Sequence, residues 1–257
     1  MNRAPMFAGR YTFPDAGRLR AAVVSFIEDA AEMRANGDLV GLIVPHGPLM
    51  EMGPVAGHAY KLLLTTPLRW DVTTLLAPTM RASAQLLCDP RDAYETPIDA
   101  LRIDHAVVNG LRTAGVAIID DEDDEPVIEC HAPFVLSALG DVPVLPLRVP
   151  AQVEAASLTV NAARLGLVIA AANLPAGHEV PACDALVRLD AGFFASEVQP
   201  KKRGLAALLA GKSTPIERSA DTATLALALM LAKANGTRRG VLLLRKGVYA
   251  ACALYRG

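Results

Sequence analysis

The chain opens with a helical pattern of apolar residues. Between residues 19 and 33, apolar side chains recur every three or four positions, which is the spacing of one helix face; they are Leu19, Val23, Phe26, Ile27, Ala30 and Met33. Asp15 stands before this pattern, and aspartate is a favoured helix N-cap. Gly37 stands after it, where a left-handed C-cap would suit glycine. We therefore predict a helix with one buried face between these two residues.

Continuous apolar runs of strand length follow at residues 39–44, 72–76, 116–119, 142–147 and 167–170. Such runs are typical of parallel strands that are buried on both faces. Helical patterns lie between them at residues 54–64, 104–113, 127–139 and 152–164. This alternation predicts an α/β fold with three αβα layers, in which helices flank both faces of a mostly parallel central sheet.

The last third of the chain is richer in helical patterns, at residues 181–194, 205–210 and 222–234, and Asn235-Gly236 is a stop signal. The pattern then changes, because two apolar runs, 241–244 and 248–254, flank the turn-forming Arg245-Lys246-Gly247. This arrangement predicts a C-terminal antiparallel hairpin. Because no internal repeat or long linker interrupts the pattern, we expect a single domain over residues 1–257.

Composition narrows the function classes. A formal net charge of -2 gives the chain no general attraction to nucleic acid or to acidic membranes. The apolar runs are shorter than the about 18 to 20 residues that cross a bilayer, and the first residues lack the apolar segment of a secretory signal. We therefore expect a cytoplasmic protein with neither nucleic acid nor membrane as a partner. The 4 cysteines are widely spaced, which indicates buried thiols, and the acidic run 120–125 is expected to be a solvated loop.

The segment from Gly41 to Lys61 carries the most informative motif. An apolar strand runs into Pro45-His46 and a glycine-bearing loop, and a helix is expected from near Pro54, in the sequence Gly-Pro-Val-Ala-Gly-His-Ala-Tyr. This segment resembles the Memo family (AmmeMemoRadiSam system protein B). Further matches keep the family's order: Ala8-Gly9-Arg10-Tyr11, Tyr94-Glu95-Thr96-Pro97, the helix from Glu125 to Phe134, and Val144-Leu145-Pro146. The resemblance implies the fold of the class III extradiol dioxygenases.

The resemblance also implies a metal-binding cleft, and the chain departs from it at most positions. His46 matches the family's first histidine. Met80 stands at the position of the second histidine, Asn173 and Ala176 stand at those of an aspartate and a histidine, and Ala220 stands at that of a cysteine. The chain is therefore a divergent member by these motifs. If the family's geometry holds, these five residues line a pocket.

One neutral histidine cannot hold a divalent ion, which needs two or three imidazole or carboxylate ligands around one point. The sequence therefore favours loss of the family's metal centre, with no cofactor. An alternative is a rebuilt site for Fe, Cu or Zn in which His46, His178 and Asp221 are the ligands, because the last two lie close to the expected positions. His58, His105 and His131 are interpreted as surface or packing residues on helices.

These observations predict a non-catalytic binding or scaffolding protein whose partner is a protein or a small organic ligand. An active metal-dependent oxidoreductase of the dioxygenase type, with a rearranged site around His46, is the alternative. A third possibility is assembly into a homo-oligomer through the C-terminal hairpin and its neighbouring helices.

Overall fold

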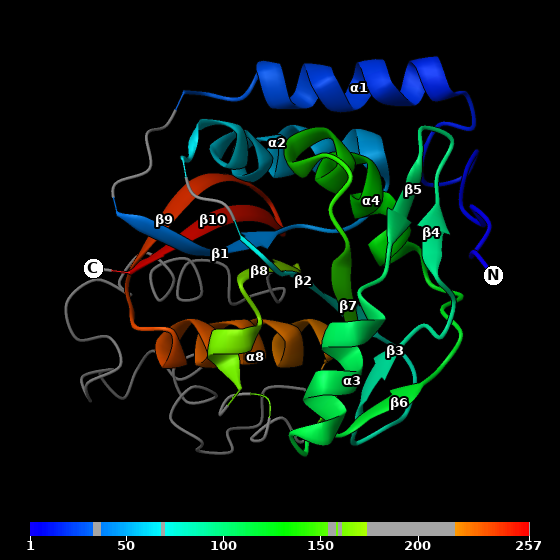
Figure 1. Ribbon diagram of the computed structural model, residues 1–257. Helices are drawn as coiled ribbons and strands as arrows, with labels where there is room; N and C mark the ends of the chain where they lie inside the picture. Colours follow the sequence, from blue (N-terminus) through cyan, green and yellow to red (C-terminus); the bar gives the residue numbers. More distant parts are fainter. Residues whose placement is uncertain (33–36, 68–69, 154–157, 159–160, 174–218, 257) are drawn as a thin grey trace.

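The computed structural model describes residues 1–32, 37–67, 70–153, 158, 161–173 and 219–256. Within these ranges the centre of the protein is an eight-stranded sheet with the strand order β6-β3-β7-β2-β8-β1-β10-β9 (Figure 1). The strands are β1 (Asp38–Val44), β2 (Thr73–Thr79), β3 (Leu86–Cys88), β6 (Ile118–Asp120), β7 (Val144–Pro150), β8 (Leu167–Ala171), β9 (Thr237–Lys246) and β10 (Tyr249–Arg256).

The four central strands β7, β2, β8 and β1 are mutually parallel, and nearly all their residues are buried. At one side β10 pairs antiparallel with β1, and β9 pairs antiparallel with β10, so the predicted hairpin is confirmed. At the other side β3 is antiparallel to β7 and parallel to β6. The mixed edges surround a parallel centre, as the apolar runs predict.

Helices cover both faces of this sheet. On one face lie α2 (Leu49–Thr65) and α4 (Pro126–Leu139), and α1 (Ala16–Glu28) packs outside them (Figure 1). On the other face lies α8 (Ala220–Ala234), next to the short helix η1 (Ala162–Arg164), while α3 (His105–Thr113) packs near β7. The strands β4 (Ala93–Glu95) and β5 (Ala100–Arg102) form a separate small antiparallel sheet. None of the helices in the described ranges is long and apolar enough to cross a membrane.

The predicted cap of α1 is confirmed, but the predicted end of that helix is wrong. The Asp15 carboxylate accepts a hydrogen bond from the Arg18 backbone N–H. The helix ends at Glu28 and not near Gly37, because α2 supplies partners for its last carbonyl groups. Lys61 Nζ donates to the carbonyl oxygens of Glu28, at 2.9 Å, and of Ala30, at 2.5 Å. These bonds satisfy groups that a longer helix would have paired internally.

The close packing of α1 on α2 requires glycine. A Cβ atom at Gly57 would lie 2.1 Å from the Phe26 carbonyl oxygen, and one at Gly53 would lie 2.5 Å from the Phe26 ring. The two glycines are four residues apart and therefore share one face of α2. The Gly-Pro-Val-Ala-Gly motif is thus explained by helix packing.

Other differences from the sequence prediction are local. Helix α2 begins at Leu49, before Pro54, because the Pro48 carbonyl accepts from the N–H groups of Glu51 and Met52 and forms the first turn. The strands β3, β4 and β5 have three residues each, too few for a recognisable pattern. The helices expected at residues 181–194 and 205–210 lie outside the described residues. Cys88, Cys130 and Cys252 are buried as expected, and Cys183 is not among the described residues.

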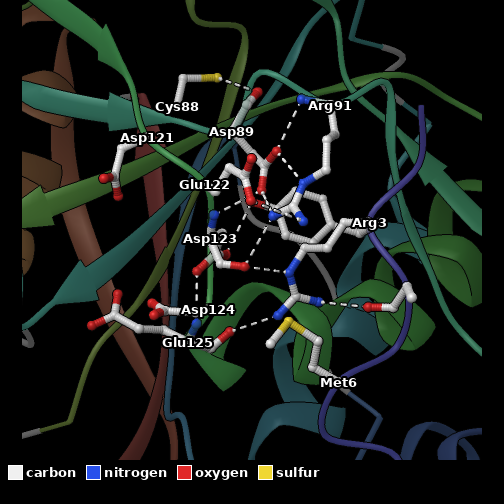
Figure 2. A network of polar contacts seen from close by, with 12 residues as sticks. Arg3, Met6, Cys88, Asp89, Arg91, Asp121, Glu122, Asp123, Asp124 and Glu125 are labelled. Carbon is white, nitrogen blue, oxygen red and sulfur yellow. Dashed lines mark hydrogen bonds and ion pairs between the residues drawn. The ribbon is translucent and has the colours of Figure 1, made fainter.

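The acidic run 120–125 is solvated only in part: Asp120, Glu122 and Asp124 are exposed, as its charge indicates, but Asp123 is buried. The Asp123 side chain is 1% exposed; it accepts from the Tyr94 hydroxyl at 3.0 Å and lies 3.6 Å from Arg148 Nη1. The Asp121 carboxylate accepts from Arg148 Nη2 at 2.6 Å. Burial raises the pKa of the Asp123 carboxyl, and the Arg148 charge opposes that rise. Three arginines, Arg3, Arg91 and Arg148, hold this loop against the protein. Figure 2 shows Arg3 and Arg91 beside the loop.

The N-terminal segment is held by the same network. Arg3 Nη1 donates to Glu129 Oε2 at 2.6 Å, and Arg3 Nε donates to the Asp123 carbonyl at 2.8 Å. The Glu129 carboxylate also accepts from the backbone N–H groups of Met6 and Phe7, at 3.0 and 2.8 Å. Both charged side chains are buried, so this pair joins the first residues to α4 without competition from water.

We predict that Glu129→Ala lowers the free energy of unfolding by about 3–5 kcal/mol, because it leaves the buried Arg3 guanidinium without a counter-charge and two N–H groups without an acceptor. Urea denaturation monitored by circular dichroism measures this change. Glu122→Ala is the matched control, since the Glu122 side chain is 78% exposed and should change stability little. Equal losses in the two variants would contradict a stabilising role for the buried pair.

Candidate functional site

The candidate site lies at the carboxyl ends of two neighbouring parallel strands. His46 follows β1 and Asn173 follows β8, and because these strands are parallel and adjacent, both residues reach the same edge of the sheet. Ligand sites in open α/β sheets commonly occur at this edge. Asp221 reaches the same place from the first turn of α8, whose N-terminus is fixed by a capping box between Ser219 and Thr222.

A closed hydrogen-bond network joins these three residues. His46 Nε2 lies 2.8 Å from Asp221 Oδ1, and the same oxygen accepts from the Asn173 backbone N–H at 2.7 Å. The Asn173 side chain forms two bonds with the backbone of His46. Its Oδ1 accepts from the His46 N–H at 3.1 Å, and its Nδ2 donates to the His46 carbonyl at 2.8 Å. We call this set the His46 cluster: His46, Asn173 and Asp221.

The network determines which imidazole nitrogen carries a proton. An ionised carboxylate only accepts hydrogen bonds, so the bond to Asp221 requires a proton on His46 Nε2. The Asn173 amide cannot be replaced by a carboxylate here, because an ionised carboxylate has no hydrogen to donate to the His46 carbonyl. The side chains of His46 and Asp221 are 20% and 30% exposed, so solvent still reaches the cluster.

His131 lies under the cluster. Its side chain is fully buried on α4, its Nδ1 lies 3.0 Å from the Tyr60 hydroxyl, and its ring contacts Phe134. Burial lowers the pKa of His131 to about 3, and the charge of His46 contributes to the decrease. A neutral His131 therefore faces the site from inside the protein. His131 was interpreted as a packing residue, and its proximity to His46 was not predicted. A histidine on the apolar face of a buried helix was nevertheless a visible signal of an unusual position.

One rim of the site is formed by the loop after β1 and by the C-terminal hairpin. The Tyr249 hydroxyl, at the start of β10, donates to Glu51 Oε2 at 2.8 Å. A Cβ atom at Gly47 would lie 3.2 Å from that hydroxyl, and Gly47 has a φ of 152°. Glycine therefore lets Tyr249 lie directly against the backbone next to His46. No sequence pattern predicted the bond between Tyr249 and Glu51, which are 198 positions apart.

The remaining predicted site residues are placed differently. Met80 follows β2 at the same edge of the sheet, but its side chain is 91% exposed and only its backbone N–H is held, by Glu125 Oε1 at 2.7 Å. Ala220 is buried in the first turn of α8, next to Asp221. Ala176 and His178 lie outside the described residues.

The described residues do not fit the metal ion that the family resemblance implies. The His46 cluster offers one imidazole and one carboxylate, and the cluster's third member is a neutral amide whose two polar atoms are already bonded to the His46 backbone. Across the described ranges, no group of three or more histidine, cysteine, aspartate or glutamate side chains is placed to hold an ion. Two donors are too few for a tight site.

Comparison with known proteins identifies the family. The family model described as "Memo-like protein" matches residues 3–170. The chain belongs to the Memo-like protein family. The match covers the strands of the parallel centre and ends within β8, before Asn173 and Asp221.

Curated relatives agree with this assignment. A MEMO1 family protein of Methanococcoides burtonii is 28% identical over 182 residues, which are 69% of this chain and 64% of that protein. One from Methanothermobacter thermautotrophicus is 25% identical over 156 residues, 57% of this chain and 56% of the relative. The Memo-like chain thus spans between about half and two thirds of the length of these relatives.

A solved structure supports the fold. The crystal structure of uncharacterized protein JW3007 from Escherichia coli K12 superposes with a TM-score of 0.55 and 13% sequence identity. The superposition covers 85% of the Memo-like chain and 100% of the other chain. At this identity the likeness extends to the fold alone.

We predict that the stability of this Memo-like protein falls with pH below about 6.5, because His131 stays neutral in the folded state and gains a proton on unfolding. The unfolded state then binds more protons, so this contribution decreases by about 1.4 kcal/mol per pH unit as the pH falls from 6.5 toward 3. Denaturant unfolding between pH 7 and pH 4 measures the slope.

In the variant His131→Asn, whose amide oxygen can still accept from Tyr60, the slope over this range should be shallower. His105→Asn is the matched control, because His105 lies at the start of α3 and is only partly buried. A slope that is the same in His131→Asn and in the unmodified chain would show that another group is responsible.

Proposed function

We propose that this chain is a non-catalytic Memo-like protein, in which a proton shared between His46 and Asp221 takes the structural place of the family's metal ion, and that it acts by binding. The observation that supports this proposal most strongly is that Asp221 Oδ1 accepts two hydrogen bonds. That oxygen receives His46 Nε2 at 2.8 Å and the Asn173 N–H at 2.7 Å, so the groups converge on one another and not on a shared open point.

The state of His46 supports the same conclusion. A metal ligand needs a nitrogen lone pair, and the proton on Nε2 occupies the one that faces Asp221. Coordination through that nitrogen would require loss of the proton and of the bond to Asp221. The hydrogen bond therefore competes with a metal ion for His46 Nε2 and Asp221 Oδ1.

Asn173 also supports the proposal that the metal ion is lost. The resemblance to the family puts an aspartate at this position, and the asparagine here has lost the charge that attracts a cation. In exchange, its amide fixes the backbone of His46 with a donor and an acceptor. An aspartate at this position would attract a cation by its charge, whereas Asn173 holds the His46 backbone by hydrogen bonds. These bonds hold the loop after β1 in place without an ion.

The exposure of polar groups around the His46 cluster supports a binding role. The cluster is partly exposed, and Tyr249 and Glu51 border it with polar groups. The proposed partner is a protein or a small organic ligand, and a second copy of the chain is a further candidate for the partner. A cluster with a few polar groups at the carboxyl edge of the sheet suits recognition of such a molecule.

A metal-dependent oxidoreductase with a rearranged site is the second candidate, and one observation favours it. Asp221 lies next to His46, and imidazole together with carboxylate are two of the ligand types of non-haem iron sites. His178 would be the third ligand in this candidate, and it lies outside the described residues. The two candidates differ in whether the protein holds a transition ion.

We predict that the protein purified without chelator contains far less than one equivalent of iron, copper or zinc, because two donors hold such ions weakly. Elemental analysis by mass spectrometry measures the content before and after incubation with each ion and desalting. His46→Ala should leave these low values unchanged. Stoichiometric metal that is lost in both His46→Ala and Asp221→Ala, but kept in the control His105→Ala, would overturn the proposal and support the oxidoreductase.

A further inference from the structure

A cavity lies at the edge of the sheet opposite the His46 cluster. Its volume is about 260 Å³, and it is bordered by the first residues of β1, by the last residue of β10 and by Trp70. Leu39 and Val40 contribute apolar wall. The volume is below the about 300–1,000 Å³ of pockets that hold drug-sized ligands, so a ligand for this cavity is small.

Two opposite charges face this cavity without pairing. Asp38 and Arg256 are directly opposite each other in the antiparallel pair of β1 and β10. In this part of the structure no ion pair joins them, and the Asp38 carboxylate has no hydrogen-bond donor among the described residues. Arg256 uses its Nε for the Asn235 carbonyl, at 3.0 Å, which leaves its two Nη groups for other partners. Oppositely charged residues at such cross-strand positions usually stabilise a sheet by pairing.

The two charges restrict the chemistry of a ligand. A ligand with only a carboxylate would meet the like charge of Asp38, and a ligand with only an amine would meet that of Arg256. A zwitterion satisfies both, because its ammonium group can bind Asp38 and its carboxylate can bind the Nη groups of Arg256 as a fork. The cavity therefore selects for a molecule that carries both groups close together.

Trp70 favours an apolar group in the part of the ligand that carries no charge. Its indole borders the 260 Å³ cavity and also a second hollow of about 180 Å³ that is lined by apolar residues such as Leu63 and Leu139. An indole that borders a cavity offers a flat apolar surface to an aromatic or aliphatic group. Asn235, whose Nδ2 donates to the Ala162 carbonyl at 3.3 Å, adds an amide oxygen at the same wall.

We propose that this cavity binds a free α-amino acid with an apolar or aromatic side chain. The ammonium group contacts Asp38, the carboxylate contacts Arg256, and the side chain packs against Trp70, Leu39 and Val40. This site is separate from the His46 cluster, because the two lie at opposite ends of β1.

The composition of the chain provides a direct signal for the test. Trp70 is the single tryptophan of the chain, so a change in tryptophan fluorescence reports on this cavity. L-phenylalanine is the probe, 3-phenylpropanoate is the matched compound without the ammonium group, and 2-phenylethylamine is the matched compound without the carboxylate. L-phenylalanine should give a saturable change, and each of the other two should bind about tenfold or more weakly, as expected for loss of a charged hydrogen bond.

Variants of Asp38 and Arg256 test which charged group of the ligand each residue binds. Asp38→Asn and Arg256→Gln should each weaken L-phenylalanine binding about tenfold or more, with the folded state checked by circular dichroism. Asp38→Asn should leave the weak binding of 3-phenylpropanoate unreduced, since that compound has no group for Asp38. Glu28→Gln, which removes an exposed charge from α1, is the matched control and should bind L-phenylalanine as the unmodified chain does.

Three results would each overturn the proposal. They are the absence of a saturable fluorescence change with L-phenylalanine, equal affinity for the three compounds, and undiminished binding of L-phenylalanine in both cavity variants. His46→Ala should bind L-phenylalanine normally, so failure here is distinguishable from failure of the proposed function of the His46 cluster.

Discussion

The carboxylate of Asp221 is the constraint on which the candidate site depends. One oxygen of this side chain joins the end of β1, through His46, to the end of β8, through the Asn173 backbone, and it holds both against the start of α8. Three elements that are distant in the sequence therefore meet at one atom. The position of Asp221 in the first turn of a capped helix favours its negative charge, because the N-terminal N–H groups of the helix carry partial positive charge. In this way the helix contributes to holding the carboxylate in place.

A second electrostatic arrangement stabilises the fold at a different place. The Arg3 and Glu129 side chains are buried together, and Arg148 is buried next to Asp121 and Asp123. Charges at these positions are expensive to bury and remain favourable only while every partner is present. The acidic loop and the N-terminal segment consequently depend on each other, although more than a hundred residues separate them. The network belongs to the structure of the protein and lies apart from the His46 cluster.

Sequence patterns predicted the parallel centre of the sheet well, because strands that are buried on both faces, such as β1 and β8, must be continuously apolar. They failed where a tertiary contact decides the local structure. Lys61 from α2 binds the Glu28 carbonyl at the end of helix α1, and Asp123 in the run 120–125 is buried because arginines from three other segments bind this loop. Within the candidate site, His46 and Asp221 were named from the sequence as ligands of an alternative metal site, and the structure places the two side chains in hydrogen-bond contact. The burial of His131 agrees with its interpretation as a packing residue, but its proximity to His46 was not predicted. The contact of Tyr249 with Glu51 was not predicted either, because residues that are far apart in the chain leave no local pattern for such a contact.

The seven residues of β1 run from Asp38, at the cavity next to Trp70, to Val44, two residues before His46. At roughly 3.3 Å per residue, this strand separates the two regions by about 20 Å. It is hydrogen-bonded to neighbours on both sides and is buried after its first residue, which makes it stiff. A stiff connection between unrelated contacts implies independence: substitutions at one end should combine additively in energy with those at the other. Evolution could then alter either end of this strand without disturbing its opposite end.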